Sequence, residues 1–396
     1  MSSLSEAAAQ EELTLRRDWT RFGIATILFA FGFAVYGGVF QNFMRDQVQA
    51  NEFDVGSLES LREIPGFLTA LMAGTLVAFA ESRIAAVGLA ISAVGIGITG
   101  AFHAMPPIIA VSIFWSVGFH LYATMQSPIT LTLARGKEGG RHLGRMAGLG
   151  GLATIAALGV SWIIAQVVGK NSYNTFFVLG GLSILGAAIA MATLSHHAAG
   201  TKRQPIVFRR EYGLYYLLIF LEGCRRQIFS IFASFSLILV YHVPVQNMLA
   251  LQFINAILIA ITAPRMGKWI DKVGERTPLM FYAVGLIIVF LGYALIRKIE
   301  ILYLLFIIDN VLFTFTNGFT MYLNRIVRPG ELTPSISMGI TVSHVAAVAI
   351  PVSGAWLWHY FGNYQIPFWV GVVFAVVSLV ATQYIPKGLP PKRETA

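Results

Sequence analysis

The chain has 396 residues, of which 56% are hydrophobic and only 12% are charged. Water-soluble domains carry about 25% charged residues, so this composition excludes an ordinary soluble enzyme or binding domain and predicts an integral membrane protein. The net charge of +9 would suggest nucleic-acid binding in a soluble protein. Here the basic residues lie in short loops between apolar segments, which indicates orientation in a membrane instead.

Apolar segments of about 20 residues can cross the hydrocarbon layer as helices. The first half of the chain contains six such segments, at 22–43, 57–80, 83–103, 106–134, 143–168 and 174–195. The second half contains six more, at 212–241, 245–264, 278–296, 301–325, 335–360 and 367–385. We therefore expect an all-α integral membrane protein with twelve transmembrane helices, a central loop at 196–211, and tails at 1–21 and 387–396.

The distribution of Lys and Arg predicts the orientation of these helices. With the N-terminus in the cytoplasm, 21 of the 28 basic residues fall in inner segments and 4 in outer loops. This bias follows the positive-inside rule and places both termini in the cytoplasm. No cleavable signal peptide is evident, so we expect a multi-pass protein of the cell inner membrane.

A short motif follows the eighth predicted helix. Residues 267–276 read GKWIDKVGER, and a weak copy, GTLVAFAESR, follows the second helix at 74–83. The segment at 267–276 resembles the loop signature of the major facilitator superfamily, Gly-x-Leu-x-Asp-Arg-x-Gly-Arg. The copy carries Ala78 where the second half carries Asp271. The resemblance implies a gating loop made by Gly267, Asp271, Gly274 and Arg276.

The same resemblance implies two pseudo-symmetric six-helix bundles, at 22–195 and 212–386, around a central cavity. In that family the bundles rock to expose the cavity to one side of the membrane and then the other. Asp271 is then expected to meet a helix N-terminus or a basic partner and to hold two helices in one conformational state.

Charged residues inside predicted helices are the strongest candidates for a site, because each costs at least about 2.5–3.5 kcal/mol at the bilayer centre. Glu222, Arg225 and Arg226 lie together near the middle of the seventh helix. Either arginine can reach Glu222 on one helix face, but not both, so one is expected to find another acid or an anionic solute. Asp309 in the tenth helix is the expected second acid.

Polar residues in other helices are weaker candidates, because hydrogen bonds between helices explain them equally well. They are His120, Tyr36, Gln126 and Asn317. For Arg62 and Glu63, an outer vestibule and an interfacial ion pair remain alternatives. The sequence contains no phosphate-binding loop, paired cysteine ligands or His-x-x-x-His spacing, so neither a metal site nor a cofactor is expected.

These features favour a secondary active transporter that moves a small anionic or zwitterionic solute, with proton coupling as an option. The expected partners are the solute, the lipid bilayer and protons, without nucleic acid, and a monomer is expected. One alternative is efflux of drugs or amphiphiles, which the absence of a Gly-Pro-Gly run at 148–151 disfavours. Another is a non-transporting receptor or scaffold with the same fold; an enzyme is not expected.

Overall fold

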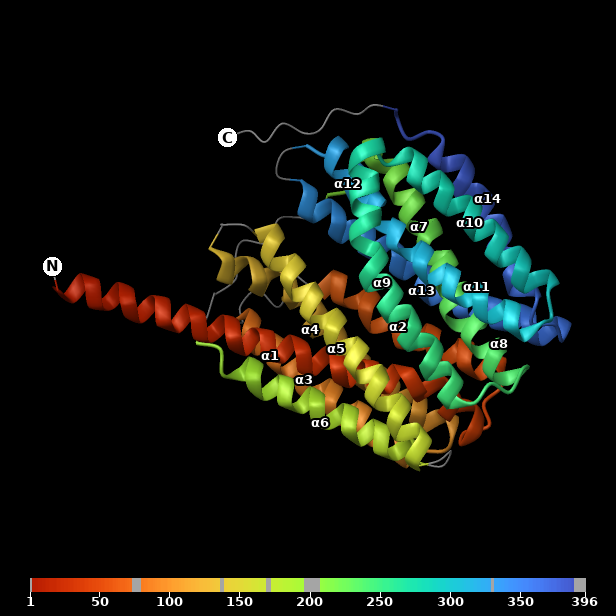
Figure 1. Ribbon diagram of the computed structural model, residues 1–396, viewed down its shortest axis with the longest axis horizontal. Helices are drawn as coiled ribbons and strands as arrows, with labels where there is room; N and C mark the ends of the chain where they lie inside the picture. The colour runs from red at the N-terminus through yellow and green to blue at the C-terminus, as the bar shows by residue number, and fades with distance from the viewer. Residues whose placement is uncertain are drawn as a thin grey trace. The chain divides into compact units, whose positions relative to one another are not determined.

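The computed structural model describes residues 2–72, 80–135, 139–168, 172–195, 207–328 and 331–387. Within these ranges all regular secondary structure is helical. The first half contains α1 (Ser2–Asp46), α2 (Glu52–Met72), α3 (Glu81–Ile98), α4 (Met105–Ala134), α5 (Gly139–Val168) and α6 (Tyr173–Ala192) (Figure 1).

The second half begins with α7 (Gly213–Gln227), a π-helical segment (Ile228–Ala233) and α8 (Ser234–Leu239), which form one continuous run. Further along lie α9 (Val245–Val273), α10 (Arg276–Leu295), α11 (Ile299–Leu312), a 3₁₀ turn (Phe313–Thr316), α12 (Asn317–Ile326), α13 (Leu332–Phe361) and α14 (Ile366–Thr382). Most of the predicted central loop, at 196–206, and most of the C-terminal tail, at 388–396, lie outside the described residues.

The prediction of an all-helical membrane fold is confirmed. In the described ranges, nine helices are long and apolar enough to cross a membrane. Three of the twelve predicted spans do not meet this measure: α2 carries Glu59, Arg62 and Glu63, the α7–α8 run is interrupted by the π-helical segment, and α14 has 17 residues. Charged residues lie in α2, in the α7–α8 run and, as Asp309, in α11, and for such residues a function other than lipid contact is expected.

Contacts divide the chain into two compact units. The first unit contains residues Met1–Phe43 and Leu68–Arg203, and the second contains Met44–Phe67 and Gln204–Ala396. The N-terminal part of α2 therefore packs within the second unit, although it lies in the first half of the sequence.

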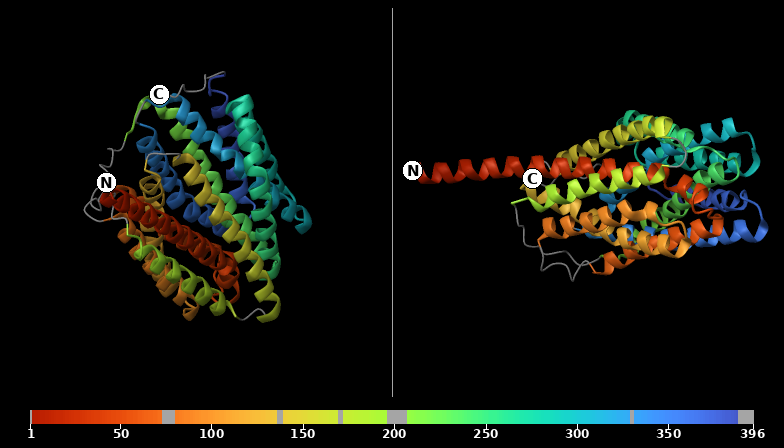
Figure 2. Two further views of the ribbon diagram at one scale, coloured as in Figure 1. Left: turned by 60° about the vertical axis from the view of Figure 1, so that its left-hand side comes forward. Right: turned by 90° about the horizontal axis from the view of Figure 1, so that it is seen from below.

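In the first unit, glycines allow helices to approach closely. A Cβ atom at Gly88 on α3 would lie 2.6 Å from the carbonyl oxygen of Gly118 on α4, and one at Gly181 on α6 would lie 2.6 Å from the Cα of Gly97. Helix α3 thus contacts both α4 and α6. The 45 residues of α1 span about 68 Å, more than twice the thickness of the hydrocarbon layer, and its N-terminal turns project past the neighbouring helices of this unit (Figure 2).

In the second unit, α10 packs against α14 and α11, while α7 packs against α13 and α14. Small residues again set the spacing: a Cβ at Gly371 would lie 2.8 Å from the Phe290 ring, and one at Gly223 would lie 3.1 Å from the Cβ of Ala346. This packing holds the C-terminal part of α7, which carries Glu222 and Arg225, next to polar residues of α10 and α11.

Candidate functional site

The charged cluster of the second unit is built around Arg225 on α7, whose exposed fraction is 3%. Its Nη2 lies 2.9 Å from Glu222 Oε1, one helical turn earlier on α7. Its Nη1 lies 3.0 Å from Asp309 Oδ2 on α11. The side chains of Arg225 and Asp309 are each 4% exposed, so water screens this ion pair little. One guanidinium therefore links two carboxylates from two helices.

Aromatic residues complete the surroundings of Arg225. The hydroxyl of Tyr282 on α10 donates a hydrogen bond to Glu222. The guanidinium carbon lies 5.5 Å from the centroid of the Tyr282 ring and 5.4 Å from that of Phe313, within the range of a cation–π interaction. With both carboxylates ionised, the four-residue cluster of Glu222, Arg225, Tyr282 and Asp309 carries one net negative charge.

The next residue, Arg226, is placed quite differently. Successive helical residues point about 100° apart, and Arg226 is exposed while Arg225 is buried. Within the described residues Arg226 makes no ion pair. It lies at the midpoint of the helical run from Gly213 to Leu239 and two residues before the π-helical segment, an irregularity frequent at functional sites. Arg226 therefore lies on a different face of the helix from the buried cluster of Arg225.

The remaining sequence-predicted site residues are dispersed. Asn317, the first residue of α12, is exposed, and Gln126 on α4 is partly exposed. His120 is 8% exposed, and its Nδ1 lies 2.9 Å from the Ser116 carbonyl oxygen. Tyr36 is 2% exposed and packs in an aromatic cluster of the first unit with Phe33, Phe40, Trp115 and Phe177. Tyr36 is thus surrounded by aromatic side chains of that unit, and His120 is buried with a hydrogen bond to its own helix.

In the predicted gating loop, α9 ends at Val273 and Gly274 adopts a φ of +81°, which favours glycine. Asp271 is exposed and makes no ion pair within the described part of the chain. The buried acid of this loop is instead Glu275, whose Oε1 lies 2.5 Å from Arg325 Nε on α12. Gly267 and Arg276 are partly exposed. The first-half copy cannot be compared, because residues 73–79, including Ala78, lie outside the described residues.

A second ionic group, missed by the sequence analysis, lies at the start of α7. Glu331 accepts hydrogen bonds from Arg209 Nε at 2.8 Å and from the Tyr212 hydroxyl at 2.7 Å. These donors lower the pKa of Glu331 to about 2. The contacts tie the segment before α7 to the beginning of α13. No motif marks these residues in the sequence, and none marks Tyr282, because each becomes significant only through its distant partner.

Comparison with known proteins decides the family. The family model of the Major Facilitator Superfamily matches residues 22–327. The chain belongs to the major facilitator superfamily. No curated protein sequence matches the chain. The resemblance found in the loop at 267–276 is therefore confirmed at the level of the superfamily, and the fold is that of its transporters.

Solved structures of superfamily members show the same fold. The chain is similar to a nucleoside transporter, NupG, with a TM-score of 0.74 at 14% identity, covering 93% of this chain and 98% of that one. It is similar to the xylose transporter XylE from E. coli in an inward-open conformation, with a TM-score of 0.72 at 13% identity, covering 96% and 98%.

A third structure is the peptide transporter POT in complex with sulfate, with a TM-score of 0.72 at 12% identity, covering 93% of this chain and 95% of that one. At such identities the likeness concerns the fold alone. These superfamily members carry different solutes, so the identity of the solute must come from the chain's own residues.

Proposed function

We propose that this superfamily member is a secondary active transporter that moves a small solute with an anionic group by alternating access. The observation that carries the proposal is the contrast between the two adjacent arginines of α7. Arg225 is buried between two carboxylates, whereas Arg226 is exposed at the midpoint of the run. A guanidinium presents several donors to a carboxylate or phosphate group, so Arg226 is the proposed contact for the solute's anion.

Charge balance supports coupling to protons. Arg225 and Arg226 contribute two positive charges, and Glu222 and Asp309 contribute two negative charges, so the four ionised groups sum to zero. An anionic solute bound at Arg226 adds one negative charge at a depth where net charge is costly. Uptake of one proton by either carboxylate restores neutrality. Solute and proton therefore favour each other's binding, which is the reciprocal linkage that symport requires.

The polar face of α12 supports a role for Asn317 as a second solute contact. Asn317, Thr320 and Asn324 are all exposed and follow one another at spacings of three and four residues, so they share one face of the helix. Helix α12 contacts α7 within the second unit. The amides and the hydroxyl of this face can hydrogen-bond the uncharged part of a solute. Gln126, in the first unit, is proposed as a further contact.

The test is transport by purified protein in vesicles. A thermal-shift screen against monocarboxylates, amino acids, nucleoside monophosphates and neutral sugars selects the probe, and labelled probe is then followed with and without a proton gradient. We expect Arg226→Gln to abolish transport while the protein remains folded in the membrane. Arg210→Gln is the matched control, because Arg210 is exposed in the 3₁₀ turn (Arg210–Tyr212) that directly precedes α7.

Three outcomes would contradict the proposal. If the Arg226→Gln variant transports the probe as well as the wild-type protein does, Arg226 is not the contact for the solute's anion. Export of a cationic dye such as ethidium, without transport of any anion in the screen, favours the efflux alternative. Absence of flux for every probe, at every proton gradient, favours a receptor or scaffold. The proposed location is the inner membrane with both termini in the cytoplasm, and the proposed state is a monomer without a metal or cofactor.

A further inference from the structure

The N-terminal part of α2 is attached to α13 at four successive levels within the second unit. Glu52, Gly56, Ser60 and Glu63 are spaced by three or four residues and therefore lie on one face of α2. Their partners on α13 occur in the reverse order, from the C-terminal end of that helix towards its middle. The two helices thus run antiparallel along a shared seam that is about 16 Å long on α2.

At two of these four levels, Gly56 and Ser60, the helices are held together by close packing and by a hydrogen bond to the backbone. A Cβ atom at Gly56 would lie 2.3 Å from the Cβ of Ala355 and 2.5 Å from the carbonyl oxygen of Pro351, so only glycine fits there without displacement. Pro351 lacks an N–H donor. The neighbouring Val352 N–H donates to Ser60 Oγ at 2.9 Å. These contacts depend on shape and are insensitive to pH.

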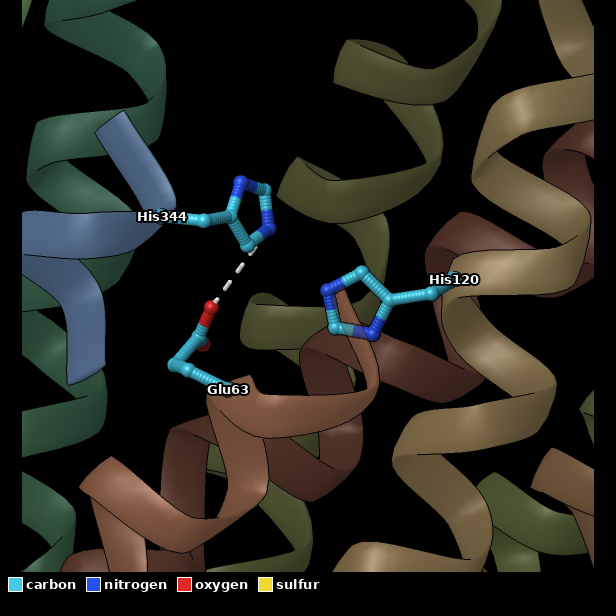
Figure 3. Close-up of side chains that lie close together, drawn as sticks. All are labelled: Glu63, His120 and His344. Carbon is cyan, nitrogen blue, oxygen red and sulfur yellow. Dashed lines mark ion pairs between the residues drawn. The ribbon is translucent and has the colours of Figure 1, made fainter. Parts of the chain in front are cut away.

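The other two levels pair a glutamate with a histidine. His359 Nδ1 lies 2.8 Å from Glu52 Oε1, with the histidine side chain 59% exposed. His344 Nε2 lies 3.8 Å from Glu63 Oε2, with side chains 14% and 20% exposed. Figure 3 shows Glu63 and His344 facing one another, with their ion pair drawn as a dashed line. The inner pair is shielded from water, whereas the outer pair is screened by it.

Hydrogen bonding fixes which ring nitrogen of His344 carries a hydrogen. Its Nδ1 lies 2.9 Å from the carbonyl oxygen of Ile340, and a carbonyl only accepts, so Nδ1 is the donor. In the neutral ring Nε2 is then an unprotonated acceptor that faces the Glu63 carboxylate, an unfavourable contact. In the imidazolium form Nε2 also carries a hydrogen, and the same contact is attractive. The sign of this interaction therefore depends on one proton.

From this geometry we infer that Glu63 and His344 form a proton-binding clamp that holds the N-terminal part of α2 against α13. The clamp is closed when the imidazole of His344 carries a hydrogen on both ring nitrogens, and it releases α2 when Nε2 loses that hydrogen. The packing at Gly56 and the hydrogen bond at Ser60 oppose release in every protonation state, so the proton changes the fraction of molecules in which the two helices separate. This clamp is separate from the carboxylates of the proposed solute site.

Other charged groups near the seam are already engaged. On α2, Arg62 pairs with Glu59. Helix α7 packs against α13 at Gly223; there Arg225 pairs with both Glu222 and Asp309, and Arg226 is exposed. On α12, Arg325 pairs with Glu275, and α14 carries no charged residue. His120, which Figure 3 also labels, belongs to the first unit, and a His120→Gln variant is included in the test.

The test measures the distance between α2 and α13 without any solute, so it is independent of the proposed transport function. Spin labels are attached at Phe53→Cys and Tyr360→Cys, which are exposed at the paired ends of the two helices, in a Cys224→Ala background. Electron–electron distance distributions are recorded in lipid nanodiscs at pH 5 and pH 8. We expect the ratio of long to short distances to rise about fivefold or more at pH 8, the range typical of linked equilibria.

Variants identify the group that responds. His344→Gln is expected to abolish the pH response, and His344→Lys to keep the short distance at both pH values, which also shows that the variant protein is folded. His359→Gln is the matched control and retains the response, because its pair is screened by water. A wild-type protein without a pH response, or a response that survives His344→Gln, or one lost only in His359→Gln or His120→Gln, overturns the inference.

If the clamp controls transport, His344→Lys also removes part of the pH dependence of flux. That consequence rests on the proposed function, whereas the distance measurement does not. If the distance between α2 and α13 changes with pH but no solute is transported, only the transporter proposal is refuted. If solute is transported but this distance does not change with pH, only the clamp is refuted.

Discussion

Replacing Arg225 by Met tests whether the buried cluster stabilises the second unit through charge. The substitution keeps a long, helix-compatible side chain but leaves Glu222 and Asp309 without their cation. Removing one partner of a buried ion pair typically costs about 3–5 kcal/mol, because the remaining charge is not compensated. With Arg225 and Asp309 each 4% exposed, solvent screening reduces this little. We expect a loss in that range for Arg225→Met.

The measurement is unfolding of the solubilised protein by SDS, followed by far-UV circular dichroism. Arg226→Met is the matched control, and its free energy of unfolding should stay within about 0.5 kcal/mol of wild type, because an exposed side chain without an ion pair is removed. The double variant Arg225→Met/Asp309→Asn should be more stable than Arg225→Met by about 0.5–3 kcal/mol, the usual size of such couplings. Equal losses for the two arginines, or a double variant no better than the single one, would refute the reasoning.

Two further predictions concern ion pairs near the ends of helices. Glu331→Gln should lower the thermal unfolding temperature at neutral pH, because Arg209 and Tyr212 hold the folded pKa of Glu331 at about 2, below its ordinary 4.5. The advantage of wild type is then present above about pH 4.5 and disappears as the pH falls towards 2, and a pH-independent difference would contradict this. Glu275→Gln should lower the same temperature more than Asp271→Asn, because only Glu275 is buried in an ion pair, and the reverse order would contradict it.

The fold was predictable from the sequence because membrane helices leave a strong local pattern. Segments of about 20 apolar residues separated by basic loops specify helices without knowledge of their neighbours. The structure places a helix or a continuous helical run at each of these segments. The assignment of Met44–Phe67 to the second unit was not predictable, because it depends on contacts such as that of Gly56 with Ala355, which are about 300 residues apart.

The site was predictable in part. A glutamate three residues before an arginine on one helix indicates a local ion pair, and Glu222 and Arg225 form it. The expectation that Asp309 pairs with the spare arginine was wrong in one respect: Asp309 binds the same arginine as Glu222, and the spare arginine, Arg226, makes no ion pair with any residue that the structure describes. Periodicity gives the angle between Arg225 and Arg226, but the side of α7 that faces α11 is set by packing, such as that of Gly223 against α13.

The consequence of this arrangement reaches beyond stability. If each arginine had its own acid, both ion pairs would be closed, and a solute anion would have to displace a carboxylate to bind. Because Arg225 takes both acids, the cluster carries a net negative charge and Arg226 an uncompensated positive one. Under the proposed function, an anion at Arg226 together with a proton at Glu222 or Asp309 would relieve the electrostatic cost of this separation. The uneven sharing of acids is thus the feature through which the proposed site would couple an anionic solute to a proton.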